Sequence, residues 1–216
     1  MKPESLNRLQ ALRVNNDTKG LQMAEERDRF DALKTRHEDG TAPRAVAAFN
    51  LFQTPPEVAQ RMAGIVHNHT GDGARILEPS AGLGRILTAL TLTCNPSEVV
   101  LVENALDCVK ELYAMTEDGS ARLLPGDFLA KTPAELGTFD AVCMNPPFKM
   151  GRDIKHISHA LKMLKSGGIL VSLCFNGTKQ NEKLKPLCNS WEELPKGSFK
   201  GEGTLANIAI ITIVKE

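Results

Sequence analysis

The stretch that most constrains the fold is an apolar run followed at once by two prolines. Residues 139–144 are apolar except for Asp140 and lead directly into Asn145-Pro146-Pro147-Phe148. A short apolar run of this kind is typical of a buried parallel strand. The prolines lack the amide hydrogens that would continue the strand, and each holds the residue before it in an extended conformation. The sequence therefore predicts a strand that ends in a stiff polar turn.

This turn carries groups that suit a planar amine. The Asn145 side-chain oxygen and the backbone carbonyls can accept hydrogens from an NH2 group, while the Phe148 ring stacks on the face of the molecule that bears it. The alternative is an ordinary turn between a strand and a loop.

Length and composition favour one α/β domain. The 216 residues contain 42% hydrophobic and 24% charged residues, which is typical of soluble globular proteins. No apolar run reaches the length of a membrane helix, and Met1 to Ser5 lack the apolar core of a signal peptide. We therefore expect a cytoplasmic protein that does not bind a membrane.

The formal net charge is zero, so no overall basic field indicates nucleic acid, although a local DNA site stays compatible with this charge. No metal site is expected, because neither the cysteines nor His67 and His69 have partners at ligand spacing. The two histidines are expected to be solvated at a helix end. The cysteines are expected to be reduced and structural, and they are Cys94, Cys108, Cys143, Cys174 and Cys188.

Residues 1–48 form a polar, mostly helix-favouring arm. Its apolar stripes, such as Leu6, Leu9 and Leu12, are too thin for an independent core. We expect a helical arm that packs on a main domain of residues 49–216. The alternatives are an arm that makes a homodimer or an arm that contacts DNA.

A helix start is expected at residues 52–57, Phe-Gln-Thr-Pro-Pro-Glu. Thr54 would be the N-cap, Pro55 the first helical residue, and Glu57 the partner in a capping box.

The next unit is typical of a nucleotide-binding βαβ motif. An apolar strand from Arg75 is followed by a turn that contains Gly82 and Gly84, and then by a helix. Glu78 at the strand end would repel a pyrophosphate but could accept hydrogen bonds from a cationic amino-acid group. A second strand, residues 98–103, ends in Glu103, at the position that usually holds ribose hydroxyls.

Asp127, in the loop Gly126-Asp127-Phe128, could accept a hydrogen bond from an adenine amine, with Phe128 beside the ring. Service as a cap or turn residue is an equal alternative for Asp127. Further helix and strand patterns alternate to the last strand, residues 208–214. This alternation predicts a doubly wound α/β sheet.

These motifs together resemble the S-adenosylmethionine-dependent methyltransferases, and most closely those that methylate the N6 amine of adenine in DNA. The resemblance covers about residues 49–216. It implies a Rossmann-like class I methyltransferase sheet, mostly parallel with one antiparallel C-terminal strand. The motifs that carry it are residues 52–55, residues 78–84, Glu103, residues 126–128 and residues 145–148.

The resemblance also implies a role for each motif residue. Asn145 and the Pro146 carbonyl would accept hydrogen bonds from the target amine, in a turn kept rigid by Pro147, and Phe148 would stack on the target base. The chemistry would be direct methyl transfer without a covalent enzyme intermediate, and a base in duplex DNA would first be flipped out. The implied cofactor site consists of Phe52, Thr54, Glu78, Pro79, Ser80, Ala81, Gly82, Gly84, Glu103, Asp127 and Phe128.

The chain departs from that family because no separate target-recognition domain follows the last strand. We therefore expect weak or short sequence specificity, as in the compact phage-type methyltransferases that the chain resembles. Phosphates would be met by the arm, by Lys149, Arg152 and Lys155, and by the lysines of residues 179–185. Related alternatives are methylation of a guanine amine in RNA or of a protein glutamine amide. An alternative of another class is a non-catalytic binding module.

Overall fold

The structure is a computed structural model, and it describes residues 52–216. The predicted arm, residues 1–48, lies outside the described residues, as do residues 49–51. Its helices and its proposed contacts with the domain, with DNA or with a second copy therefore remain predictions.

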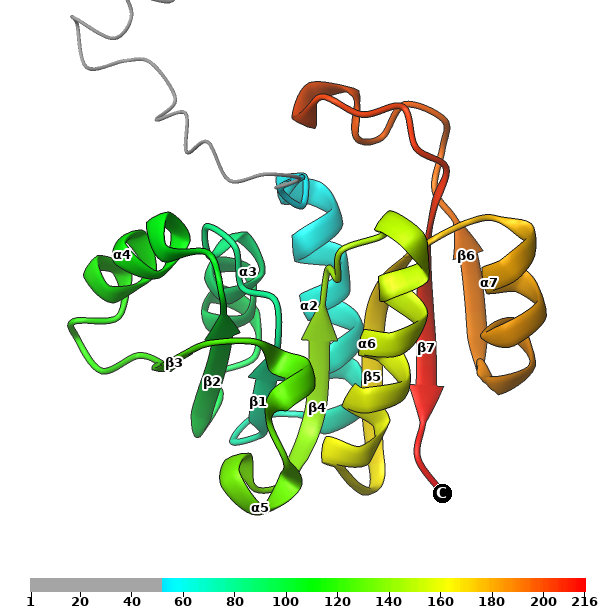
Figure 1. Ribbon diagram of the computed structural model, residues 1–216. Coiled ribbons are helices and arrows are strands. Elements are labelled where there is room, and N and C mark those ends of the chain that lie inside the picture. Colours follow the sequence, from blue (N-terminus) through cyan, green and yellow to red (C-terminus); the bar gives the residue numbers. More distant parts are fainter. Residues whose placement is uncertain (1–51) are drawn as a thin grey trace, which may run out of the picture. The chain divides into compact units, whose positions relative to one another are not determined.

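Strands and helices alternate along the described chain (Figure 1). The strands are β1 (Arg75–Glu78), β2 (Glu98–Glu103), β3 (Arg122–Pro125), β4 (Phe139–Met144), β5 (Leu164–Phe175), β6 (Ser190–Glu193) and β7 (Ile208–Val214). The α-helices are α2 (Pro56–Thr70), α3 (Arg85–Thr93), α4 (Leu106–Met115), α5 (Pro133–Leu136), α6 (Arg152–Ala160) and α7 (Thr178–Lys183). Short 3-10 turns are η1 (Phe128–Ala130), η2 (Lys149–Gly151), η3 (Leu161–Met163), η4 (Lys185–Leu187) and η5 (Lys200–Glu202).

The seven strands form one sheet in the order β3-β2-β1-β4-β5-β7-β6. The strands from β3 to β5 are parallel to their neighbours, whereas β7 runs antiparallel to both β5 and β6. This confirms the predicted sheet, including its antiparallel C-terminal strand. The direction of winding reverses between β1 and β4, and ligands of doubly wound folds bind at the carboxyl ends of the strands that flank such a reversal.

Helices cover both faces of the sheet (Figure 1). On one face, buried residues of α2 and α3 pack on β1, β4 and β5, and α4 joins α3 over β2. On the other face, α6 packs over β4 and β5 together with η1 and α5. The central strands are buried on both sides, which explains why their sequences read as continuous apolar runs.

The start of α2 differs from the prediction. Pro56, not Pro55, is the first residue of the helix, and Pro55 stands at the N-cap with no side-chain cap. The expected capping box of Thr54 and Glu57 is therefore wrong. The Thr54 hydroxyl is instead bonded to Asn145, which follows β4.

Other expectations concern the cysteines, metal binding and membrane spans. All five cysteines are free thiols, and four of them are buried. Within residues 52–216, no group of His, Cys, Asp and Glu side chains could hold a metal ion. In the same part of the chain, no helix has both the length and the apolar character that a membrane span requires.

Candidate functional site

The polar residues of interest follow three adjacent strands at one edge of the sheet. Glu78 ends β1, Glu103 ends β2, and Asn145 comes directly after β4. Because these strands are parallel and adjacent, their carboxyl ends meet at the same edge. The fold therefore gathers the three predicted positions at the point where the sheet reverses its winding.

Asn145 is held in one orientation by its amide nitrogen. The nitrogen, Nδ2, donates to the Phe52 carbonyl oxygen at 3.0 Å and to the Thr54 hydroxyl oxygen at 3.1 Å. A backbone carbonyl can only accept, so the amide nitrogen must face Phe52, and both amide hydrogens are used. The side-chain oxygen of Asn145 is left as an acceptor without a donor among the described residues.

The rest of the tetrad forms a rigid rim beside that oxygen. Pro146 is buried, and Pro147 and Phe148 are half-buried. Phe148 packs against the core on the α2 side, and its carbonyl accepts from the Gly151 amide at 3.2 Å. The ring is therefore fixed at its inner side while part of it stays open at the edge.

The turn after β1 brings backbone close to this edge. Pro79, Ala81 and Gly82 are buried, Ser80 is half-buried, and Gly82 and Gly84 have φ angles of 55° and 76°. A Cβ at Gly84 would lie 2.8 Å from the Met115 methyl carbon. The backbone conformation therefore favours glycine at position 84, and a larger residue would also have to displace the end of the Met115 side chain.

Glu103 fastens the glycine turn to β2. One carboxylate oxygen accepts from the Gly82 amide at 2.7 Å, and the other accepts from the amides of Asn104 and Ala105, each at 2.8 Å. An ionised carboxylate has about four acceptor positions. These three bonds leave one for a further donor such as a ribose hydroxyl.

Glu78 has the opposite environment. It is 1% exposed, and its Oε2 atom has no hydrogen-bond partner. Burial raises the pKa of Glu78 well above its usual value, and the nearby Glu103 raises it further, although a hydrogen bond from the Leu87 amide lowers it. A buried carboxylate with a free oxygen is well placed to receive a positively charged group.

Asp127 and Phe128 are arranged differently. Asp127 is exposed and accepts from the Leu129 amide at 3.0 Å, so it serves as the cap that the sequence left open, with its second oxygen free. Phe128 is only 2% exposed, and its ring meets His159 edge-on with centroids 4.8 Å apart. The Phe128 ring thus lies in the core, and the sequence did not indicate this direction.

Two residues of α6 were missed by sequence reasoning. Asp153 is fully buried and accepts from the Phe175 amide and from Gln180. His156 is 5% exposed, lies 5.8 Å from the Phe128 ring between centroids, and has no partner at either ring nitrogen. Their spacing of three residues places both on the buried face of α6, but a polar residue there carries no signal of its function.

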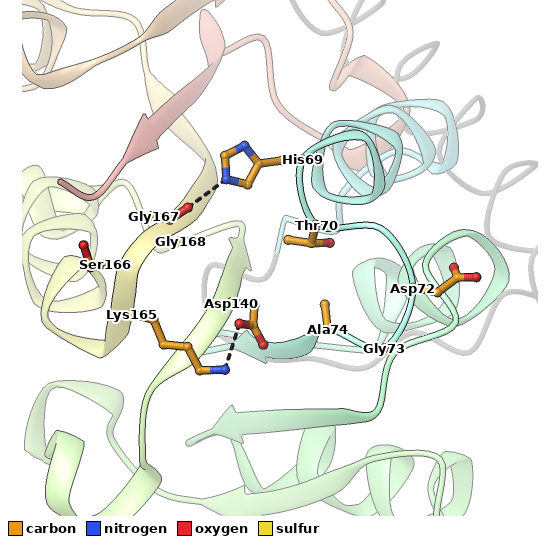
Figure 2. Close-up of a pocket in the computed structure, with 10 residues that line it drawn as sticks. All are labelled: His69, Thr70, Asp72, Gly73, Ala74, Asp140, Lys165, Ser166, Gly167 and Gly168. Atoms are coloured by element: carbon orange, nitrogen blue, oxygen red, sulfur yellow. Dashed lines mark hydrogen bonds and ion pairs between the residues drawn. The ribbon is translucent and has the colours of Figure 1, made fainter.

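A hollow of about 370 Å³ lies at the other end of the sheet (Figure 2). It is lined by the end of α2, the loop into β1 and the first residues of β5, which are amino ends of parallel strands. Asp140 there is bonded to Lys165 at 2.7 Å and to the Arg75 amide at 2.9 Å, and His69 is bonded to the Gly167 carbonyl. The Asp140, Lys165 and His69 side chains are thus bonded to the protein itself, so we place the candidate functional site at the carboxyl edge.

Comparison with known proteins identifies the family. The family described as "Methyltransferase small domain" matches residues 62–199, which is more than half of the chain. The chain belongs to the methyltransferase small domain family. No protein with curated information matches the sequence.

Solved structures agree on the fold of this methyltransferase. A Pyrococcus horikoshii protein provisionally assigned as an RNA methyltransferase has a TM-score of 0.61 and 17% identity, over 77% of this chain and 88% of its own. TrmN from Thermus thermophilus has a TM-score of 0.57 and 19% identity, and the match covers 74% of this chain and 49% of TrmN. An RNA methyltransferase from Salinibacter ruber, in complex with S-adenosylhomocysteine, has a TM-score of 0.51 and 19% identity, over 76% and 95%. At these identities the likeness concerns the fold alone.

The cofactor of the methyltransferase is S-adenosylmethionine, and the residues at the carboxyl edge fit it. The free Oε2 atom of Glu78 is a buried acceptor that suits the ammonium group of the methionine moiety. Glu103 retains room for a ribose hydroxyl, and the glycine turn lets backbone approach closely. These residues could therefore offer a buried carboxyl group to the amino end of the cofactor and a hydrogen-bond acceptor to its sugar.

Proposed function

We propose that this methyltransferase transfers the methyl group of S-adenosylmethionine to the exocyclic N6 amine of an adenine in DNA. The observation that carries the proposal is the orientation of Asn145. Its amide nitrogen is fully used by Phe52 and Thr54, so only the side-chain oxygen is free to meet a substrate. An acceptor fixed in this way selects a group that donates hydrogens, such as an aromatic NH2.

The residues of the tetrad would act by position. The Asn145 oxygen and the Pro146 carbonyl accept the two amine hydrogens, which holds the nitrogen in place and turns its electron density toward the methyl donor. Phe148 fixes the plane of the base by stacking on it. When bound, S-adenosylmethionine supplies an electrophilic methyl group on a positively charged sulfur. Neither acceptor is a base at neutral pH, so the displaced amine proton leaves to solvent.

The cofactor residues would surround the other side of the reaction. Glu78 receives the ammonium group, and Glu103 receives the ribose. Phe52 and Thr54 lie next to Asn145 through the hydrogen bonds above and would line the methionine end of the cofactor. We further propose that the exposed Asp127 receives the adenine amine through its unbonded oxygen. Phe128 would support that contact from the core, since its ring is almost fully buried.

A second candidate is methylation of an RNA base. It is favoured by structures of similar fold from Pyrococcus horikoshii, Thermus thermophilus and Salinibacter ruber, two of which are described as RNA methyltransferases. The same tetrad geometry would serve a guanine amine or a glutamine amide, because each presents a planar NH2 group.

The test is transfer of labelled methyl from S-adenosylmethionine to unmethylated DNA, ribosomal RNA and a protein extract in parallel. We expect N6-methyladenine in digested DNA. Asn145→Ala should lower the rate by about a hundredfold or more, because it removes a preorganised acceptor. Label in RNA or protein alone would contradict the DNA assignment. Cofactor binding with no transfer to any of the three would favour a non-catalytic binding module.

A further inference from the structure

The turn between β4 and α6 has a strained backbone at its tip. Met150 has φ 60° and ψ 25°, the left-handed conformation, and Gly151 follows with φ 70°. Asn95 is the one other non-glycine residue with positive φ in the part of the chain that the structure describes. Asparagine tolerates this conformation, whereas a long side chain adopts it only at an energetic cost.

The strain does not bury the Met150 side chain. This side chain is 87% exposed, the highest value among the large hydrophobic residues of the described chain. It stands two residues after Phe148, whose carbonyl accepts from the Gly151 amide and closes the turn. Strain of this kind gathers at functional sites, and here it holds an apolar side chain in solvent beside the tetrad.

Hydrogen bonds fix the start of α6, which directly follows this turn. The Asp153 carboxylate, fully buried at the start of α6, accepts from the Phe175 amide at 3.1 Å and from the Gln180 amide nitrogen at 3.0 Å. These bonds join the turn to the end of β5 and to α7. The exposed Met150 side chain is therefore attached to a part of the chain that hydrogen bonds hold in place.

Positive charges flank the tip. Lys149 and Arg152 lie on either side of it in the sequence and are exposed. The Lys179 ammonium comes so close to Gly151 that a Cβ there would lie 3.4 Å from its Nζ atom. Across residues 52–216, none of these three cations is paired with a carboxylate. They are therefore available for an anionic partner.

We propose that the turn 149–152 enters duplex DNA as a wedge, with Met150 filling the space of the target base that moves to Phe148. This inference rests on the proposed function. An apolar tip among unpaired cations matches the duplex, in which stacked bases lie between two rows of phosphates. Apolar side chains, methionine among them, are inserted between base pairs by proteins that deform DNA. Met150 would replace the stacking contacts that the neighbouring bases lose when the target base flips out. A target base in a single strand does not have to leave a duplex, so its methylation does not need Met150.

Met150→Gly is the decisive variant. Glycine removes the side chain and accepts the left-handed backbone without strain, so the fold should not suffer. The comparison is methyl transfer to a fully paired duplex and to the same sequence as a single strand. We expect the ratio of paired to single-stranded activity to fall about tenfold or more, because the variant no longer compensates for the unstacking of the target base. Leu92→Ala, which changes another highly exposed apolar residue, on α3, should leave the ratio unchanged.

A second readout separates this inference from the proposed function. Permanganate oxidises thymines that are unstacked. It should therefore attack duplex DNA in complex with the wild-type protein and sinefungin, a cofactor analogue that transfers no methyl group. The attack should be much weaker in the same complex with Met150→Gly. Attack without any methyl transfer would support the wedge and contradict the proposed function. Methyl transfer to duplex DNA with an unchanged ratio and an unchanged permanganate pattern in Met150→Gly would overturn the wedge alone. Absence of both DNA binding and transfer would overturn both.

Discussion

Glu78 and Glu103 end neighbouring parallel strands at one edge of the sheet, yet only Glu103 has both carboxylate oxygens bonded to the protein. Three backbone amides donate to the Glu103 carboxylate, whereas Oε2 of Glu78 has no partner. Burial and the charge of Glu103 both favour the protonated form of Glu78 and raise its pKa. The same edge therefore holds one carboxylate that backbone amides stabilise and one carboxyl group whose ionised form lacks a partner for its second oxygen.

This difference predicts that binding of S-adenosylmethionine releases a proton from Glu78. In the free protein, Glu78 stays protonated from its usual pKa range up to the raised value, and an ammonium group favours the carboxylate. The affinity should therefore rise with pH in that window. Titration calorimetry in two buffers of different ionisation enthalpy should give different apparent enthalpies. Glu78→Gln should remove this difference and weaken binding about tenfold. Identical enthalpies for the wild type would contradict the prediction.

Thr54→Val tests whether the Thr54 hydroxyl acts through Asn145. Valine keeps the shape but removes one of the two acceptors that orient the Asn145 amide. We expect kcat to fall about tenfold, since a misplaced acceptor weakens the transition state more than it weakens cofactor binding. Thr54→Ser keeps the hydroxyl and should recover most of the rate. A large loss of cofactor affinity with unchanged kcat would mean that Thr54 acts on the methionine end of the cofactor alone and not through Asn145.

The contact between Thr54 and Asn145 could not be predicted from the sequence. The two residues are 91 positions apart, and the local pattern around Thr54 is that of an N-cap. A threonine hydroxyl can serve either partner, so the choice depends on tertiary neighbours. By contrast, the sheet and the positions of Glu78, Glu103 and Asn145 at strand ends were predictable, because apolar runs and prolines mark where strands stop.

The side on which the Phe128 ring packs could not be predicted from the sequence either. The motif Gly126-Asp127-Phe128 correctly predicts a loop after a strand, but not the side on which the ring packs. That side is set by His156 and His159 of α6, which meet the ring from a distant part of the chain. An aromatic residue beside an expected ligand site can therefore belong to the core.

Gly84→Ala should destabilise the fold through both backbone and packing. The φ angle of 76° disfavours any Cβ, and this Cβ would lie 2.8 Å from the Met115 methyl carbon. The Met115 atoms are the far end of a flexible side chain and can shift, so most of the loss comes from the backbone, and we expect the free energy of unfolding in urea to fall by about 1–2 kcal/mol. Gly119→Ala is a matched control, because Gly119 has φ 79° with nothing within 4 Å, so it should show only the backbone cost of about 1 kcal/mol. Equal losses for the two variants would mean that Met115 moves aside freely.

His156 should make the protein sensitive to acid. Burial, together with the charges of Arg152 and His159, lowers the pKa of His156 from 6.5 to about 4, although the charge of Asp127 opposes this. The unfolded chain therefore binds a proton that the folded chain refuses, and the stability present above pH 6.5 is lost as the pH falls toward 4. In urea unfolding at several pH values, His156→Phe should flatten this slope.

His156→Phe should also change the stability of the protein at neutral pH. Phenylalanine removes two buried nitrogens that have no hydrogen-bond partner, so the free energy of unfolding should rise by about 1–3 kcal/mol. His69→Phe, at an exposed position, should keep the wild-type acid slope. If His156→Phe kept that slope too, water would have to reach the His156 ring in solution, because only a hydrated imidazole can take up a proton there without cost.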